Sequence, residues 1–157
     1  RRRSGGLGER TLIIIKPDAM QRGLAGEIIR RFEARGLRIV GMKFMQISRE
    51  LAEEHYKEHK ERKFYESLLA YITSSPVIVM VLEGTSAIEA ARNTIGLTKP
   101  VQAAAGTIRG DLGIETGRNL VHGSDKPESA QREVNLFFSP EELLTWQRDT
   151  DRWIFEG

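Results

Sequence analysis

The sequence predicts an α+β fold of the ferredoxin-like βαββαβ type, in which helices cover a four-stranded antiparallel sheet. The first observation is a continuous apolar run at residues 77–82, which follows Pro76 directly and is typical of a central strand. The second is a pair of further β-rich segments at residues 11–16 and 37–47. The third is the helical periodicity of the stretches that separate these segments, which places helices between the strands.

The first half of the chain alternates between strand and helix. The strand at residues 11–16 ends at Pro17, which cannot continue a ladder of backbone hydrogen bonds, so we expect a loop there. Residues 25–35 carry apolar side chains at helical spacing, and Gly36 is suited to end that helix. Two more helices are expected before the central strand: residues 49–60, with Ser48 as N-cap, and residues 64–72.

The second half changes character after a helix at residues 86–95. Residues 96–117 contain five glycines and little periodicity, and a loop of that length in a compact domain is usually functional. A short strand at residues 119–122 and a helix at residues 128–136 follow. Ser139, Pro140 and Glu142 then form the capping-box start of a last helix.

Length and composition indicate one domain. A chain of 157 residues is long enough to close a single apolar core. No apolar run approaches the roughly 20 residues of a membrane helix, and the first residues lack the apolar region of a signal peptide. The absence of cysteine excludes disulfides, thiol catalysis and Cys-ligated zinc. We therefore expect a cytoplasmic protein with no membrane partner.

The positive charge is concentrated at the N-terminus. Residues 1–10 carry a formal charge of +3, whereas the whole chain carries +2, so residues 11–157 sum to −1. We interpret residues 1–10 as a flexible basic tail and residues 11–157 as the folded domain. Because the domain is nearly neutral, we expect no nucleic-acid partner.

His122 is the candidate for chemistry among the three histidines. It ends a short apolar strand and precedes Gly123, so the strand can hold its backbone while the ring faces a pocket. A free imidazole has a pKa of about 6.5, so one nitrogen offers a lone pair for attack on phosphorus. Glu133, on the following helix, is suited to orient the other nitrogen. From the residues alone, a nucleophile and a buried core histidine are equally good interpretations.

His55 and His59 stand four residues apart and would share one face of a helix. That spacing can bind a metal, but no third ligand is obvious. The charged neighbours indicate a surface helix, and they are Glu54, Lys57, Glu58 and Lys60. We expect no metal site among these residues.

Side chains would have to bind any phosphate, because the chain contains no G-x-x-x-x-G-K-[ST] loop. The candidates are Lys16 at the end of the first strand and three arginines in or beside the long loop, Arg92, Arg109 and Arg118. A guanidinium group binds phosphate oxygens in bidentate fashion. For any one of these arginines alone, a solvated surface charge is the commoner interpretation.

The heptapeptide Asn119-Leu120-Val121-His122-Gly123-Ser124-Asp125 resembles the active-site signature of the nucleoside diphosphate kinases. The resemblance extends over nearly all of residues 10–156. Further motifs occur in the same order, namely Lys16-Pro17-Asp18, Gln21-Arg22-Gly23-Leu24, Gly26-Glu27-Ile28, Glu54-His55-Tyr56, Gly106-Thr107-Ile108-Arg109-Gly110-Asp111 and Glu128-Ser129-Ala130. Any one tripeptide is weak, but the ordered set is highly specific.

The resemblance implies a ping-pong kinase. A nucleoside triphosphate, typically ATP, would phosphorylate His122, and a nucleoside diphosphate would then take the phosphoryl group. By the same resemblance, Glu133 and Ser124 would orient the ring of His122, and Tyr56 would shape its surroundings. Mg2+ would arrive with the nucleotide, and base specificity would be broad.

The positions that match nucleotide contacts in the family are Lys16, Phe64, Arg92, Thr98, Arg109 and Asn119. Lys16 and Asn119 would serve the ribose end of the nucleotide and its phosphates, whereas Arg92, Thr98 and Arg109 would bind the phosphates. Phe64 would stack on the base, and stacking accepts every base because each has a π-face.

Two positions depart from the commoner family pattern. Ala105 stands before Gly106 where many members carry proline, so the loop loses some rigidity. Ala19 replaces a common glycine. In the family this loop also contributes to trimer contacts, and the ending Trp153-Ile154-Phe155-Glu156 resembles tails that pack on a neighbouring subunit. We therefore expect a homohexamer rather than a tetramer.

Two alternatives remain at this point. One is a catalytically silent family member that binds nucleotide or nucleic acid as a regulatory module, although such a homologue would be expected to lose some catalytic positions. The other is a protein-histidine phosphotransfer module. Those modules usually carry their histidine on a bundle helix, whereas His122 follows an apolar strand.

Overall fold

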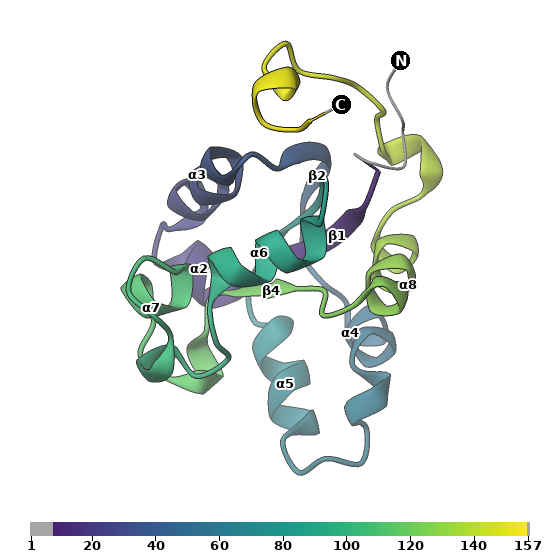
Figure 1. Ribbon diagram of the computed structural model, residues 1–157. Coiled ribbons are helices and arrows are strands. Elements are labelled where there is room, and N and C mark those ends of the chain that lie inside the picture. Colours follow the sequence, from purple (N-terminus) through teal and green to yellow (C-terminus); the bar gives the residue numbers. More distant parts are fainter. Residues whose placement is uncertain (1–7, 157) are drawn as a thin grey trace.

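The computed structural model describes residues 8–156, which form a four-stranded antiparallel sheet covered by helices (Figure 1). The strands, in the sheet order β2-β3-β1-β4, are Arg38–Met45, Val77–Glu83, Arg10–Ile15 and Val121–Gly123. Each neighbouring pair is antiparallel, and β3 is a central strand as its apolar run predicts. The ferredoxin-like prediction is confirmed.

Seven α-helices occur in the described residues. In chain order they are α2 (Pro17–Gln21), α3 (Ala25–Arg35), α4 (Arg49–His55), α5 (Tyr65–Ile72), α6 (Ala87–Ile95), α7 (Ile108–Leu112) and α8 (Pro127–Phe137). Short 3-10 turns join them at Lys57–His59, Pro100–Gln102, Thr116–Arg118, Pro140–Glu142 and Asp151–Trp153. In Figure 1 the α4–α5 hairpin projects away from the C-terminal segment.

Both faces of the sheet are buried, which explains why β1 is apolar at every position after Thr11. Leu12 and Ile14 face a core built with α4, α5 and α8. Ile13 and Ile15 face a second core built with α3, α6 and α7. All four side chains are fully buried, and alternate residues of a strand point to opposite faces. The sheet is therefore a rigid support for residues at its ends and edges.

Several predicted helix boundaries are confirmed by their capping geometry. Gly36 ends α3 with φ of +111°, in the left-handed region that glycine adopts without steric cost. Ser48 caps α4 by accepting a hydrogen bond from the backbone N–H of Leu51. The predicted helix 49–60 is too long, however. The α-helix ends at His55 and a 3-10 turn follows.

Three other predictions were wrong in detail. Pro17 starts helix α2 rather than a loop, because its fixed φ suits the first helical position. The predicted loop 96–117 contains α7, whose N-cap Thr107 accepts a hydrogen bond from the backbone N–H of Gly110. The capping box at Ser139 forms, but only a 3-10 turn follows it.

Glu9 and Arg10, which the sequence assigns to the tail, contact the sheet and α6. Glu9 accepts hydrogen bonds from the backbone N–H groups of Gly84 and Ile88, and Arg10 lies in β1 and pairs with Glu83. Residues 1–7 of the predicted tail lie outside the described residues. Between residues 8 and 156, no helix has both the length and the apolar composition needed to cross a bilayer.

Candidate active site

His122 lies in the middle of β4, an outer strand that pairs with β1 alone. Its Nε2 atom is 2.9 Å from Oε1 of Glu133, which projects from α8. The hydroxyl of Ser124 donates a 2.7 Å hydrogen bond to the same oxygen. The structure therefore brings together the nucleophile candidate and both residues expected to orient it.

The ionised carboxylate of Glu133 fixes the tautomer of His122. Burial would raise the pKa of Glu133, but the hydrogen bond and charge of His122 and the hydrogen bond of Ser124 lower that pKa to about 2. An ionised carboxylate can only accept hydrogen bonds, so Nε2 of His122 must carry the proton. The lone pair is then on Nδ1. The side chain of His122 is 21% exposed, so this nitrogen belongs to a ring that solvent can reach.

The second ring beside His122 is His55, at the last position of α4. Its centroid is 5.0 Å from that of His122, and the two rings meet edge to face. Tyr56 contacts His55 at 4.6 Å, and burial raises the pKa of the Tyr56 hydroxyl. Burial and the neighbouring His122 lower the pKa of His55 to about 3, so its ring stays neutral. The interpretation of His55 as a surface residue was wrong.

A cationic cluster lies at the end of β1. Nζ of Lys16 donates a 2.9 Å hydrogen bond to Oδ1 of Asn119, and both side chains are buried. Burial and the nearby Arg109 lower the pKa of Lys16 to about 8, and Asp18 opposes that shift. A buried ammonium group gains most from an anionic ligand, because few solvent molecules compete for it.

Arg109 links three backbone positions near Lys16 and His122. Its guanidinium donates hydrogen bonds to the backbone carbonyls of Asn119, Val121 and Gly96, at 3.0, 2.6 and 3.3 Å. Burial and the charge of Arg92 lower its pKa to about 10. A guanidinium has five donors, so two remain for a ligand after these three bonds. Arg92 donates to the carbonyl of Gly123, the residue after His122.

The backbone between the cationic cluster and His122 is strained. Leu120 has a φ of +76°, which costs a non-glycine residue roughly 1–3 kcal/mol. Its N–H donates to the carboxylate of Asp18, and its carbonyl accepts from the N–H of Lys16. These bonds hold Asn119 beside Lys16 while His122 continues into β4.

The remaining residues predicted from the sequence are exposed, namely Phe64, Thr98 and Arg118. Phe64 is 44% exposed at the N-terminus of α5, with the ring of His59 at 5.8 Å. Thr98 is exposed in the bend between α6 and the turn at Pro100–Gln102. Arg118 lies over the ring of Tyr71 at 5.0 Å, and Nζ of Lys16 lies 5.8 Å from the same ring.

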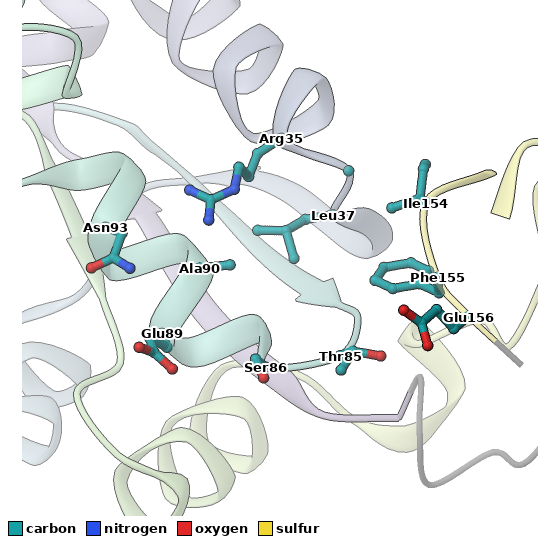
Figure 2. A pocket seen from close by; sticks show the side chains of 11 residues that line it. Arg35, Leu37, Thr85, Ser86, Glu89, Ala90, Asn93, Ile154, Phe155 and Glu156 are labelled. Atoms are coloured by element: carbon teal, nitrogen blue, oxygen red, sulfur yellow. The ribbon is translucent and has the colours of Figure 1, made fainter. Parts of the chain in front are cut away.

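Two larger hollows lie away from His122. A pocket of about 520 Å³ lies between α6, the end of α3 and the C-terminal residues Ile154 and Phe155, and Figure 2 shows the side chains that line it. A second pocket, of about 620 Å³, is lined by residues of α2 and α5 together with Arg118. Arg92 lines a third pocket, of about 420 Å³, together with Asp125. None of these three pockets is lined by His122.

Sequence reasoning missed two residues of this region. His55 follows Ala52 by three positions, and this helical spacing could have shown that it shares the buried face of α4. The sequence indicates no role for Asp18 beyond its place in the Lys16-Pro17-Asp18 motif. Its carboxylate accepts bonds from the hydroxyl of Tyr71 and the N–H of Leu120, contacts that link distant segments and leave no local signal.

Comparison with known proteins shows which family the chain is similar to. The sequence model of the family described as "Nucleoside diphosphate kinase" matches residues 9–143. A nucleoside diphosphate kinase of Pelotomaculum thermopropionicum is 60% identical over 148 residues, which cover 94% of this chain and 99% of the relative. One from Archaeoglobus fulgidus is 53% identical, with 94% and 98% covered.

Solved structures show the same fold. A nucleoside diphosphate kinase from Halobacterium salinarum, in complex with CDP, superposes with a TM-score of 0.92 at 49% identity. A family protein from Babesia bovis gives 0.91 at 48%. Both comparisons cover 94% of this chain and 99% of the other. On the family match and these identities, the chain belongs to the nucleoside diphosphate kinase family and is a phosphotransferase that acts on nucleotides.

Proposed function

We propose that His122 carries the phosphoryl group between a nucleoside triphosphate and a nucleoside diphosphate in a ping-pong reaction. One observation carries this proposal: the ionised Glu133 accepts the Nε2 proton of His122 and so leaves the Nδ1 lone pair free. Ser124 holds the carboxylate in position. A nucleophile oriented by an acceptor, which is itself oriented by a third group, is the usual arrangement for covalent catalysis.

In the first half-reaction, Nδ1 attacks the terminal phosphorus, an N–P bond forms and the bond to the bridging oxygen breaks. The diphosphate leaves with that oxygen, and the ring becomes cationic while Nε2 keeps its proton. Glu133 stabilises the charged ring by its own negative charge. The second half-reaction reverses these steps with a different diphosphate.

The cations at the end of β1 would stabilise the negative charge that builds up on the phosphate oxygens. Arg92 and Arg109 reach the backbone on either side of His122, and Lys16 lies beside Asn119. Catalysis of phosphoryl transfer rests mainly on such positioning and electrostatic stabilisation. We assign Lys16 and Asn119 to the ribose and phosphates, and Arg92, Thr98 and Arg109 to the phosphates. Tyr56 packs beside His55 and supports the surroundings of His122.

Phe64 is proposed to stack on the nucleotide base. Its half-exposed ring stands at the start of α5, free of a tight core contact. Stacking on an aromatic face does not distinguish one base from another, so broad base specificity would follow. The CDP bound to the Halobacterium salinarum relative is consistent with a site that takes nucleotides.

Magnesium is proposed to enter on the substrate. In residues 8–156, the group of close histidine and carboxylate ligands contains two ring nitrogens and one carboxylate. Mg2+ prefers oxygen ligands and commonly binds through substrate phosphates. The donor set of the chain therefore fits Mg2+ carried by the nucleotide rather than a resident Mg2+.

We propose that the chain works as a homohexamer in the cytoplasm. Val101 and Ile114, in the segment between α6 and β4, are more than 70% exposed, and so is Trp153 near the C-terminus. Covering these apolar side chains with another subunit would remove apolar area from water, which is favourable. The mass of the assembly in solution tests this proposal.

The test of the proposed reaction is phosphoenzyme formation. Wild-type protein is incubated with γ-labelled ATP and Mg2+, next to a His122→Asn variant. We expect acid-labile label on the wild type, its discharge by GDP, and no label on the variant. Label that persists when any diphosphate is added would rule out nucleotide exchange, and an unlabelled wild type would support a silent family member.

A further inference from the structure

Three ligand atoms converge at the active centre from three separate elements. His55 on α4, His122 on β4 and Glu133 on α8 each offer one ring nitrogen or carboxylate oxygen, and these atoms all lie within 4.8 Å of one another. The proposed phosphoryl transfer uses His122 and Glu133 directly. It gives the ring of His55 no chemical role.

The ring of His55 is buried and incompletely satisfied. The residue is 6% exposed, and within the described part of the chain its Nδ1 atom has no hydrogen-bond partner. Apolar edges surround it, since the ring of Phe137 is 5.4 Å away and that of Tyr56 is 4.6 Å away. A buried polar atom without a partner is destabilising, so an apolar side chain would pack better here unless the nitrogen binds something.

The donor set matches a borderline-soft divalent cation. Two histidines and one glutamate are a common set for zinc in sites that keep a fourth position open. Ring nitrogens favour Zn2+ or a similar transition metal over Mg2+. Ser124 already bonds to the Glu133 carboxylate, which is the kind of outer contact that orients a metal ligand.

The ligand atoms must shift to bind a cation, because pairs that lie up to 4.8 Å apart must approach and the closer His122–Glu133 pair must open. Bonds of about 2.0–2.2 Å in a tetrahedral arrangement place ligand atoms about 3.4 Å apart. The His122–Glu133 pair is already closer than this, at 2.9 Å. The side chain of His122 is 21% exposed, and a cation that replaces its hydrogen bond to Glu133 releases the ring to adjust its distance to the buried His55.

We propose that His55, His122 and Glu133 form a site for a zinc-type divalent cation, and that the bound cation prevents phosphorylation of His122. A cation on Nδ1 of His122 uses the lone pair that would attack phosphorus. A cation on Nε2 displaces its proton to Nδ1 or to solvent, replaces the hydrogen bond to Glu133 and withdraws electron density from the ring. Either arrangement makes the active centre sensitive to a metal that is not the one carried by the nucleotide.

The test is calorimetric titration of chelator-treated full-length protein with ZnCl2, in buffer that contains excess Mg2+. We expect one Zn2+ per chain for the wild type and an affinity at least about tenfold weaker for His55→Phe and Glu133→Gln. The control is His59→Asn, which removes a nearby histidine outside the cluster and should bind as the wild type does. Circular dichroism confirms that each variant is folded.

A second readout needs no variant. Long-range proton–nitrogen spectra of the wild type should show one equivalent of Zn2+ shifting the ring nitrogens of His55 and His122 but not those of His59. Stoichiometric binding that survives in folded His55→Phe, ring shifts confined to His59, or no stoichiometric binding would each overturn the proposal.

The effect of Zn2+ on the phosphorylation of His122 is measured separately. One equivalent of Zn2+ should reduce the initial rate of phosphoenzyme formation at least about tenfold, and a zinc-selective chelator should restore it. Zinc binding with an undiminished rate would overturn the inhibitory part of the proposal. Protein that forms no phosphoenzyme even without Zn2+ would contradict the proposed function, while the calorimetric result on the metal site would stand.

Discussion

The charge of Lys16 depends on its burial, and this dependence gives the site a pH response. With a pKa near 8, the free enzyme carries the ammonium group below that pH and loses it above. We expect the affinity for a nucleoside diphosphate to fall as the pH rises through about 8. A Lys16→Gln variant should bind about 10–100-fold more weakly at neutral pH, because it lacks a charge-assisted hydrogen bond.

The measurement is the dissociation constant of both proteins across the pH range. The two curves should approach each other at about pH 9.5, where the lysine is neutral. Parallel curves at every pH would show that Lys16 is not the group that titrates.

The ring of Phe64 is expected to contribute to nucleotide affinity. Phe64→Ala should weaken nucleotide binding by roughly 1–3 kcal/mol, because a base loses its stacking partner. Binding of adenosine, guanosine and cytidine diphosphates should be weakened to a similar extent, as calorimetric titration can show. If affinity for all three stayed the same, Phe64 would have no role in the site.

Individual site residues could be predicted where a motif names them and not where only tertiary contacts do. His122, Ser124 and Glu133 stand in recognisable motifs, and the structure places them in one hydrogen-bonded group. His55 also lies in such a motif, but its contact with His122 joins α4 to β4 across 66 intervening positions and has no local sign.

At the scale of elements, the segment that carries α7 positions the cationic side of the site. Arg109 projects from α7 and bonds to the backbone before His122, so the shape of this short helix controls where Asn119 and Val121 lie. A five-residue helix is not stable alone. It persists because Thr107 caps it and because Ile108 is buried in the core.

A substitution in this segment tests that role. A side chain at Gly110 would overlap the backbone carbonyl of Ala104, so the segment must shift. We expect Gly110→Ala to lower the free energy of unfolding by about 1–3 kcal/mol and to reduce the rate of phosphoenzyme formation. Gly117→Ala is the matched control, since nothing lies within 4 Å of the added carbon. Equal behaviour of the two variants would contradict the account of α7.

Long elements were predictable from periodicity, whereas short ones were not. The strand pattern and α3 follow from apolar spacing over many residues. Helices α2 and α7 have five residues each, too few for a periodic signal, and depend on Pro17 and Thr107 at their starts. The segment after Ser139 leaves its helical turn because the N–H of Leu144 bonds to the carbonyl of Val40 in β2.

At the scale of the whole molecule, buried ion pairs hold the C-terminal segment to the sheet. Arg38 of β2 pairs with Asp151 at 2.8 Å and also with Glu83 of β3, and the side chains of Arg38 and Asp151 are 3% exposed. Arg148 adds a further bond to Asp151. Residues 144–156 lie beyond the part matched by the family model, yet they contact β2.

Removing the buried partner should be costly. Asp151→Asn is expected to lower the free energy of unfolding by about 3 kcal/mol, because Arg38 loses one of its two carboxylates in a buried site. Lys57→Gln removes an exposed ion pair with Glu54 and should leave stability nearly unchanged. Urea denaturation measures both values, and a similar small effect for both variants would show that the C-terminal segment contributes little.

The central claim is that Glu133 holds the Nε2 proton of His122 and so directs phosphorylation to the other nitrogen. Alkaline digestion of the labelled phosphoenzyme, followed by chromatography against authentic phosphohistidine isomers, identifies the nitrogen that carries phosphorus. The hydrogen-bond geometry predicts the Nδ1 isomer. Phosphorus on Nε2 would contradict the account.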